Sequence, residues 1–592
     1  MPKSAWNQIV IAPLSGPLDT RSKPAELAPG SLRYKLNLAI NRTGALSVSP
    51  GYEALDFGLR SDDPTLSTNW DFHYRNQITR EPVTFLFEAT DTSGKHWLYA
   101  GTSSTLSFLD FATSQWTPLA INAVTGAQWR ASVLGDTITF TSGVRNPGVT
   151  EVYFSTIGTT QWDEILDDTR TQRAKIAVSY AGFAVLLNVF YNGAEERSRV
   201  MWSDYKSGGD FRKLPLTSIA GFKDLDYGDE ILNAVEMMGG LYIFTTRAIW
   251  RATLNPSTDP AAPSLLFNKI YSEPKNQAGC LVYANTLVAT GRELYWWSHD
   301  SIWTFNPYLV APETPEWLLK GSGATFDSAN ADRAETRCCE TVIGEYRPLT
   351  KEIHFSYPAG LDTDTPVCTN NRELIVNTEY RTMHITDQGF SAYCNFRKSS
   401  ATETACSDPQ LFIGASTQDY CLKSLGTPFS REQVTLVGGD VTQDITDFDY
   451  ATSLAGYYAR VVGSVPMPYP NQEKIVREFL IDGEITPNAL AYPNLLTLRI
   501  GNHFNLVDPV SSEAQCAPMW HDQDALPMIC PDTATTAAML AENERPSDPI
   551  SWTMWEVGNR IYYDLRITAA DGTAPVNHAM SMSAFRFDVA LI

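Results

Sequence analysis

The sequence predicts an all-β protein: a β-propeller of about six to eight blades, an extended N-terminal arm and a C-terminal β-sandwich or platform domain. Three observations carry this prediction. A turn followed by a short apolar strand recurs at intervals of roughly 50 residues. The 37 glycines and 35 prolines are spread along the chain, which suits many short strands joined by turns. At 592 residues, with 43% apolar and 19% charged side chains, the chain is folded and too long for one core.

The repeat has two landmarks that run in step. Turns that precede an apolar strand begin at positions 47, 58 and 45 residues apart, namely Gly135, Gly182, Gly240 and Asn285. Aromatic residues that follow a polar turn lie 46 and 49 residues apart, namely Trp116, Trp162 and Phe211. One four-stranded blade cannot cover its own apolar face, so neighbouring blades bury it and aromatics fill the space between them. Unrelated β-hairpins in a sandwich remain the alternative, because the spacing is loose.

Changes in pattern divide the chain into three parts. Residues 1–60 read as an extended docking arm, since their prolines interrupt helices and remove strand donors, and such an arm has to lie across another surface. Residues 61–440 hold the repeat and are assigned to the propeller. Residues 441–592 are assigned to the sandwich, with strands at 476–481 and 495–500, a hairpin over 552–567, a terminal strand at 585–590 and a short helix at 536–544.

The charge balance argues against one class of function. The chain has 45 basic and 67 acidic residues, a net charge of −22 and a pI near 4.8. Proteins that grip phosphate backbones usually carry the opposite sign, so tight static nucleic-acid binding is disfavoured, whereas a surface along which nucleic acid slides is compatible. No apolar stretch approaches the roughly 18 residues of a membrane span, and no signal-peptide region is present at the start, so we expect a soluble chain made in the cytosol.

The nine cysteines include no CxxC pair and are odd in number. In a chain of this length they are better explained as reduced thiols than as a disulfide framework. A strained bridge between the adjacent Cys338 and Cys339 is the alternative, and two free thiols are the preferred interpretation.

The sequence names no active site. Phosphate-binding, zinc-protease and nucleophile-elbow motifs are all missing, and the eight histidines are scattered without metal-ligand spacing. The acidic loop formed by Asp224, Asp226, Asp229 and Glu230 has oxygen ligands that suit calcium, but a solvated acidic turn is favoured. We therefore expect a protein that is not an enzyme, with no catalytic, cofactor-binding or metal-binding residue.

Three groups of residues carry a family resemblance. The N-terminal segment contains Pro29-Gly30-Ser31, Leu36-Asn37, Gly44-Ala45-Leu46 and Pro50-Gly51-Tyr52. The second group is the segment 199–204 (RVMWSD) within a predicted blade, together with Asp210-Phe211. The third group is the segment 558–563 (GNRIYY). Together these resemble the tail nozzle, or tail-tube hub, proteins of tailed bacteriophages, which include tail tubular B-type and β-propeller DNA-stabilisation proteins.

The resemblance implies a structural virion protein in the phage tail. Such proteins form a ring, typically a homohexamer, below the portal and the head–tail adaptor. They extend and close the channel through which double-stranded DNA leaves, without sequence-specific binding or stable membrane insertion, and they contact tail fibres or spikes. The chain is then assembled in the host bacterial cytoplasm. The family pattern does not explain the cysteines between positions 338 and 421.

A second hypothesis is a glycan-binding or glycan-processing propeller that recognises host surfaces. Exposed aromatics would stack on sugar rings, and Trp296, Trp297 and Trp303 are the candidates, although packing inside a blade is the more common use of such residues. A cellular interaction scaffold is the default if both hypotheses fail.

Overall fold

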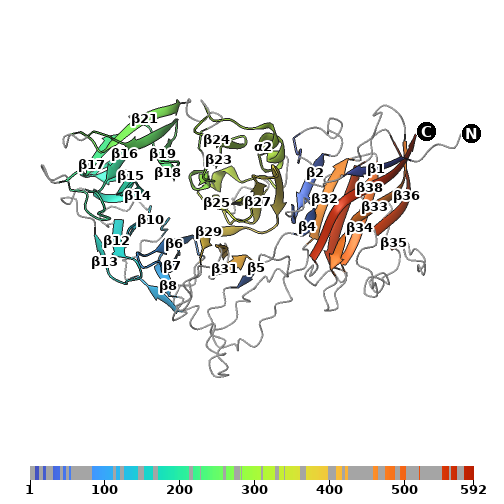
Figure 1. Ribbon diagram of the computed structural model, residues 1–592, viewed down its shortest axis with the longest axis horizontal. Coiled ribbons are helices and arrows are strands. Elements are labelled where there is room, and N and C mark those ends of the chain that lie inside the picture. The colour runs from blue at the N-terminus through green and yellow to red at the C-terminus, as the bar shows by residue number, and fades with distance from the viewer. Residues whose placement is uncertain are drawn as a thin grey trace, which may run out of the picture.

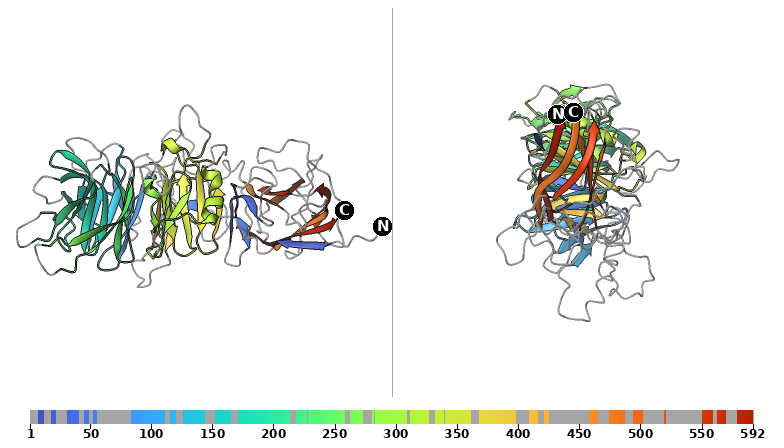
Figure 2. Two further views of the ribbon diagram at one scale, coloured as in Figure 1. Left: turned by 90° about the horizontal axis from the view of Figure 1, so that it is seen from above. Right: turned by 90° about the vertical axis from the view of Figure 1, so that its right-hand side faces the viewer.

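We describe the chain from a computed structural model, shown in Figure 1. The described parts are residues 7–11, 18–21, 31–40, 45–48, 52–54, 83–110, 115–119, 126–143, 152–164, 171–212, 218–226, 228–257, 262–272, 280–281, 283–308, 311–326, 332–338, 340–360, 368–397, 409–415, 421–424, 458–464, 474–486, 494–501, 519–520, 550–558, 562–569 and 579–591. In this part of the chain, a propeller and a β-sandwich lie side by side along the longest axis (Figures 1 and 2).

Seven blades form the propeller in the described residues. Blades I to IV are four-stranded antiparallel sheets in chain order. Their strands are β6 (Phe85–Thr90), β7 (His96–Gly101), β8 (Leu106–Asp110) and β9 (Gln115–Pro118); β10 (Arg130–Leu134), β11 (Thr137–Thr141), β12 (Val152–Thr156) and β13 (Trp162–Glu164); β14 (Thr171–Tyr180), β15 (Phe183–Tyr191), β16 (Ala194–Trp202) and β17 (Gly221–Asp224); β18 (Ile231–Met237), β19 (Gly240–Thr245), β20 (Ala248–Leu254) and β21 (Leu265–Ser272).

Blades V to VII complete the ring. Their strands are β22 (Val288–Ala289), β23 (Leu294–Trp297) and β24 (Ile302–Phe305); β25 (Ile343–Arg347), β26 (Glu352–Tyr357), β27 (Arg372–Asn377) and β28 (Thr382–Thr386); β29 (Phe390–Phe396), β30 (Gln410–Ala415), β31 (Cys421–Ser424) and β5 (Tyr52–Ala54). In blade V, Glu313 exchanges two backbone hydrogen bonds with Thr304 and takes the place of a fourth strand. The inner strand of each blade lies beside that of the next, and β29 lies beside β6. The predicted all-β propeller of six to eight blades is therefore confirmed, with seven blades.

The sequence landmarks correspond to fixed places in the blades. Gly135 and Gly182 have positive φ angles of 61° and 90° and form the turns that lead into the second strands β11 and β15. Gly240 begins β19, the second strand of blade IV. Asn285 differs, because it lies in the short 3-10 helix η3 (Ala284–Thr286) before the inner strand β22. Its shorter spacing of 45 residues from Gly240 reflects this change of position within the blade.

Two facing sheets form the sandwich. One contains β3 (Leu38–Ile40), β4 (Leu46–Val48), β38 (Ala579–Leu591), β33 (Lys474–Thr486), β36 (Ile550–Gly558) and β35 (Met519–Trp520), with β1 (Asn7–Ile11) also paired to β38. The other contains β2 (Leu32–Leu36), β32 (Tyr458–Ser464), β37 (Tyr562–Ala569) and β34 (Asn494–Gly501). The predicted hairpin over 552–567 is wrong: β36 and β37 pair with different strands and belong to different sheets. The predicted helix at 536–544 lies outside the described residues.

The described strands of the N-terminal segment lie across the rest of the chain and join the two domains. Strands β1 to β4 belong to the sandwich, and β5 is the outermost strand of blade VII. Strand β2 also pairs in parallel with β28 at Leu36 and Ile385, so blade VI and one sandwich sheet form a continuous eight-stranded sheet. Figure 1 shows the blue strands β2 and β4 between the two domains. One hydrophobic cluster runs from blades V and VI through Leu36 and Leu38 to Phe585 in β38.

Asn37 makes the bend at which the chain leaves one sandwich sheet for the other. Its backbone is in the left-handed region, with φ 57°, and the residue is 0% exposed. Its backbone N–H donates to the Ile385 carbonyl at 2.8 Å, and its Oδ1 accepts from the Asp387 N–H at 3.2 Å. After glycine, asparagine is among the residues that adopt this backbone conformation most readily.

This bend gives a first prediction. Asn37→Gly keeps the left-handed backbone and loses the hydrogen bonding of the side chain, so we expect the free energy of unfolding to fall by about 1 kcal/mol. Asn37→Val adds backbone strain and is expected to lower it by about 3 kcal/mol. Denaturant unfolding of both variants measures the difference. Equal losses would contradict a backbone role for Asn37.

One disulfide joins Cys338 to Cys368, which are 30 residues apart with 5.2 Å between their Cα atoms. The prediction of reduced thiols is wrong for these two, and the alternative bridge to Cys339 is also wrong, because the fold brings Cys368 of the next loop against Cys338. Cys280 and Cys394 are buried.

Candidate functional site

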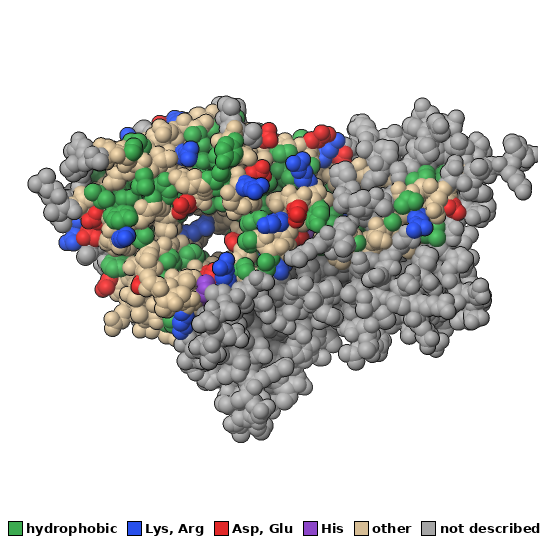
Figure 3. All heavy atoms as spheres, in the orientation of Figure 1, with side chains coloured by type: hydrophobic (Ala, Val, Ile, Leu, Met, Phe, Trp, Pro, Cys, Tyr) green, Lys and Arg blue, Asp and Glu red, His purple; other side chains and the backbone are tan. Residues whose placement is uncertain are grey.

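A cavity of about 620 Å³ lies at the centre of the propeller. It is lined by residues of the inner strands or their leading segments in every blade, from Phe85 of β6 round to Tyr393 of β29. Figure 3 shows the opening at the centre of the ring, with lysine or arginine atoms visible inside it. Small residues such as Ala131, Ala177 and Ala234 line the cavity and keep it open.

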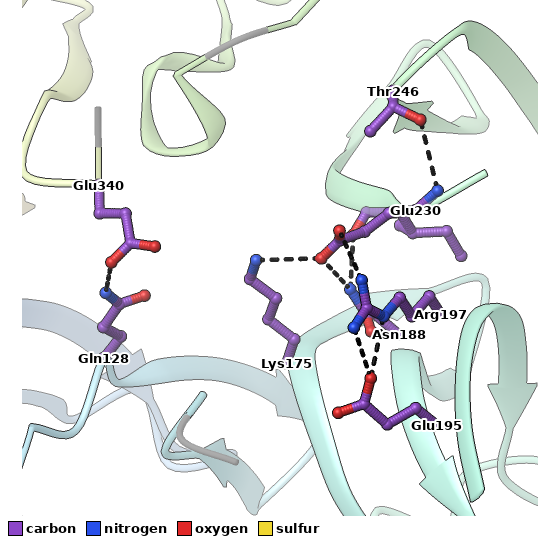
Figure 4. Close-up of polar contacts among 9 residues, drawn as sticks. Gln128, Lys175, Asn188, Glu195, Arg197, Glu230, Thr246 and Glu340 are labelled. Carbon is purple, nitrogen blue, oxygen red and sulfur yellow. Dashed lines mark hydrogen bonds and ion pairs between the residues drawn. The ribbon is translucent and has the colours of Figure 1, made fainter. Parts of the chain in front are cut away.

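Polar contacts cross the cavity from one side of the ring to the other. Glu340 precedes β25 of blade VI, and its carboxylate accepts from Nε2 of Gln128, before β10 of blade II, at 3.0 Å (Figure 4). Nδ2 of Asn285 donates to the Glu340 carbonyl at 2.9 Å, and Arg130 of β10 donates to the Asn285 side-chain oxygen. Cys368 of the disulfide also lines the cavity. These contacts cross part of the space and narrow it.

The cavity lining includes three charged side chains, of which Arg130 and Glu345 are half-buried and Glu340 is exposed. Arg130 is on β10, and burial lowers the pKa of its guanidinium to about 10, which leaves it charged at neutral pH. Glu345 is on β25, and burial raises the pKa of its carboxyl to about 7, although a hydrogen bond from Asn395 Nδ2 at 2.6 Å and the charge of His354 oppose the rise. Both groups therefore lie in surroundings that disfavour charge.

A buried acid–histidine cluster lies behind Glu345 and joins blades VI and VII. His354 Nδ1 lies 2.8 Å from Oε1 of Glu373, and the Tyr393 hydroxyl donates to the same oxygen at 2.6 Å. Burial alone would raise the pKa of Glu373, but the His354 charge and hydrogen bonds from His354, Tyr393 and Thr386 lower it overall. The Glu373 carboxylate therefore accepts hydrogen bonds from several buried side chains, which is typical of a polar network with a structural role.

The carboxylates of the acidic loop considered as a calcium site form ion pairs within the propeller. Its carboxylates pair with separate cations: Asp224 with Arg199 at 2.6 Å, Asp226 with Lys269, and Asp229 with Arg247 at 3.5 Å. Glu230 accepts from Asn188 at 3.1 Å and lies 3.5 Å from Lys175 Nζ, which ties blade IV to blade III (Figure 4). The carboxylates point to different partners and do not converge on one point. In the part of the chain described, no group of three potential metal ligands is found.

The aromatic residues considered for sugar stacking are part of the blade cores. Trp296 and Trp297 are 0% exposed, and Trp303 packs against the cluster between blades IV and V. Trp297 contacts the rings of Tyr283, Phe355 and Tyr357. Trp296 and Trp297 are therefore unable to meet a glycan at the surface, and the half-buried Trp303 is the one of the three candidates that stays partly accessible.

Sequence reasoning assigned no site residue and missed Arg130 and Glu345. Neither belongs to a motif, and they are 215 positions apart in the sequence. The only available signal was their place in the inner strands, where a charged residue interrupts short apolar segments. Among the described helices, none has the length and apolar character to cross a membrane.

Comparison with known proteins adds the fold class alone. No family model and no curated protein matches this chain. Among solved structures, YCF48 bound to D1 peptide is 12% identical, covers 59% of this chain and 93% of its own, and has a TM-score of 0.34. The Cps50 (Swd1) β-propeller domain of Myceliophteria thermophila is 11% identical, with 59% and 99% covered and a TM-score of 0.34. PorZ, from the type-IX secretion system of Porphyromonas gingivalis, is 9% identical, with 67% and 43% covered and a TM-score of 0.33. The chain is similar to these β-propellers in architecture, and none of the three is a phage tail protein.

Proposed function

We propose that the chain is a structural subunit of a phage tail nozzle, without enzymatic activity. In this role, copies form a ring, typically a hexamer, below the portal and adaptor, extend and close the DNA-ejection channel, and anchor tail fibres. The protein resides in the virion tail after assembly in the bacterial cytoplasm. The proposal derives from the sequence resemblance, and it is separate from the structural neighbours, which bear on fold only.

One observation supports the proposal most. The residues of the N-terminal resemblance coincide with joints of the fold: Leu36 ends β2, Asn37 makes the bend, Leu46 begins β4 and Tyr52 begins β5. The same segment makes the propeller and sandwich continuous through one sheet and one core. A subunit that bears load between an adaptor and fibres needs such a rigid connection, because a flexible linker would let the two domains move independently.

The propeller cavity is unsuited to carrying the genome. The contacts of Gln128 and Arg130 with the segment around Glu340 and Asn285 cross it. In the proposed ring, DNA therefore passes between copies, around the common axis, and the net charge of −22 disfavours sticking to the walls.

The test is to find the chain in purified particles. We expect it to co-sediment with tailed phage particles and expect antibodies against it to label a ring at the tail end in electron micrographs. Antibodies against a capsid protein, which should label only the head, provide the control. Particles of normal composition that lack the chain would rule out this function.

A further inference from the structure

The disulfide between Cys338 and Cys368 lies at the propeller cavity, with one half buried and the other accessible. Cys338 is 3% exposed, whereas Cys368 is an exposed residue that lines the cavity. A disulfide is broken by attack of a thiolate on one of its sulfurs, so an exposed half gives a reductant its point of entry. Accessible disulfides are typical of labile or regulatory bonds.

The buried half of the disulfide holds a turn that reaches across the cavity. The Cys338 carbonyl accepts from the Thr341 backbone N–H at 3.1 Å and from the Thr341 hydroxyl at 2.9 Å. Between these two residues, Glu340 meets other blades: its carboxylate accepts from Gln128 at 3.0 Å, and its carbonyl accepts from Asn285 at 2.9 Å. The disulfide therefore anchors the residue whose contacts narrow the cavity.

The remaining contacts of this turn are individually weaker than a covalent bond. Asn370, two positions after Cys368, ties the same two segments together, because its Nδ2 donates to the Thr341 carbonyl at 2.8 Å. Glu340 and Gln128 are both exposed, so water competes for the hydrogen bond between them. A disulfide contributes more to stability than any one hydrogen bond of this kind. Loss of the disulfide therefore leaves the turn held by contacts that open readily.

We propose that the Cys338–Cys368 disulfide is a redox-sensitive latch that sets the width of the propeller cavity. In the oxidised chain, the turn at Glu340 stays against Gln128 of blade II and Asn285 before blade V, and the cavity is narrow. In the reduced chain, the turn releases both partners and the cavity widens. The latch gives a role to two of the cysteines that the family resemblance does not explain.

The step that opens the latch needs a dithiol as reductant, which supplies two electrons and two protons. One thiolate of the dithiol attacks Cys368 Sγ, the S–S bond breaks, and Cys338 leaves as a thiolate that takes up a proton. The second thiol then attacks the mixed disulfide, and Cys368 leaves in the same way and takes up the second proton. The dithiol ends as a cyclic disulfide.

The latch itself is independent of the proposed role in a phage tail. Its timing in that role rests on the proposed function: the latch is open during assembly in the reducing cytoplasm and closes in the released particle. Experiments on the purified chain test the latch alone, so failure of the latch and failure of the proposed function are distinguishable.

The first test asks whether the folded chain allows this bond to be reduced. We would treat the full-length protein with dithiothreitol under native conditions, quench the reaction, and label the thiols in denaturant with a maleimide for peptide mapping. We expect Cys338 and Cys368 to gain label relative to an untreated sample, while the circular dichroism spectrum before quenching stays unchanged. A bond that is reduced only after unfolding would overturn the proposal.

The second test measures where the chain responds. Hydrogen exchange of the oxidised and the reduced protein should differ at the amides of Glu340 and Thr341 and at residues 126–130, with exchange at least about tenfold faster after reduction. Strands β15 and β19, in other blades, should exchange at the same rate in both states. Equal acceleration throughout the propeller, or none at these segments, would mean that the disulfide only adds stability.

Substitutions attribute the response to this bond. The double variant Cys338→Ser with Cys368→Ser should exchange like the reduced chain, with or without dithiothreitol. Glu340→Ala keeps the disulfide but removes the carboxylate that Gln128 contacts, so its oxidised form should already exchange faster at residues 126–130. Glu316→Ala, which removes an exposed glutamate absent from the cavity lining, should keep the full response. A response to reductant that persists in the double variant would refute the latch.

Discussion

Deletion of residues 1–54 is expected to unfold the C-terminal sandwich and to loosen the propeller at blade VII. The deletion removes β1 to β4 from the sandwich and β5 from the edge of the last blade. It also removes apolar side chains that are fully buried in the shared core, namely Leu18, Leu32, Leu36, Leu38, Ile40 and Leu46. Each is worth about 1.5–3 kcal/mol, so their sum reaches the total stability of a typical domain, about 5–15 kcal/mol.

Calorimetry and limited proteolysis separate the two effects. The intact chain should resist cleavage in both domains, whereas the deletion variant should be cut rapidly after residue 450 and retain a weaker transition from the propeller. A shorter deletion, of residues 1–6, removes no described strand and should behave like the intact chain. A sandwich that stays protected after the larger deletion would show that the N-terminal strands are accessory.

Local periodicity explains why the propeller could be predicted from sequence. Each blade is made of strands adjacent in the chain, so a turn such as Gly182 and the aromatic Phe211 recur at blade spacing. The apolar strands at 495–500 and 563–567 are β34 and β37, and they pair with each other. Their partnership could not be read from the sequence, because both carry similar alternating patterns and β36 offered a nearer partner.

The N-terminal segment escaped prediction for a different reason. Its strands of three to five residues are too short to show a period and, apart from the pairing of β3 with β4, their partners lie hundreds of positions away. The disulfide between Cys338 and Cys368 depends in the same way on a contact between two loops. The candidate site depends on ring closure, because Arg130 and Glu345 share a cavity only when seven blades form a circle. The N-terminal strand pairing, the disulfide and the candidate site all depend on contacts between distant segments, and such contacts leave no local pattern in the sequence.

Lys35 shows how far a residue type can mislead. The sequence places a lysine in a short strand, where a solvent-facing position would be expected. In the structure it is 1% exposed and lies opposite Val461 of β32, which is itself opposite Leu565 of β37. Directly opposed residues share one face of a sheet, and both neighbours belong to the hydrophobic core, so Lys35 points into the sandwich. Its Nζ has no hydrogen-bond partner among the described residues.

Replacing this lysine by methionine is expected to stabilise the protein, and by an amount that depends on pH. Burial lowers the pKa of Lys35 from 10.5 to about 7, so below pH 7 the native chain holds a charge in its core. A shift of that size corresponds to about 4–5 kcal/mol, and methionine has a similar volume without the charge. We therefore expect Lys35→Met to raise the free energy of unfolding by about 3–5 kcal/mol at pH 6.

The sign of the pH dependence distinguishes this cause from better packing. Between pH 7 and 10.5 the unfolded chain binds a proton at Lys35 that the native chain has released, so the stability of the unmodified protein contributed by this residue rises with pH. The advantage of Lys35→Met should shrink across the same window and nearly vanish above it. Denaturant unfolding at pH 6, 8 and 10 measures the trend, with Lys223→Met, at an exposed position in β17, as the control. An advantage that stayed constant with pH would mean that the lysine gains its solvation from water or from a partner, and that the core carries no buried charge.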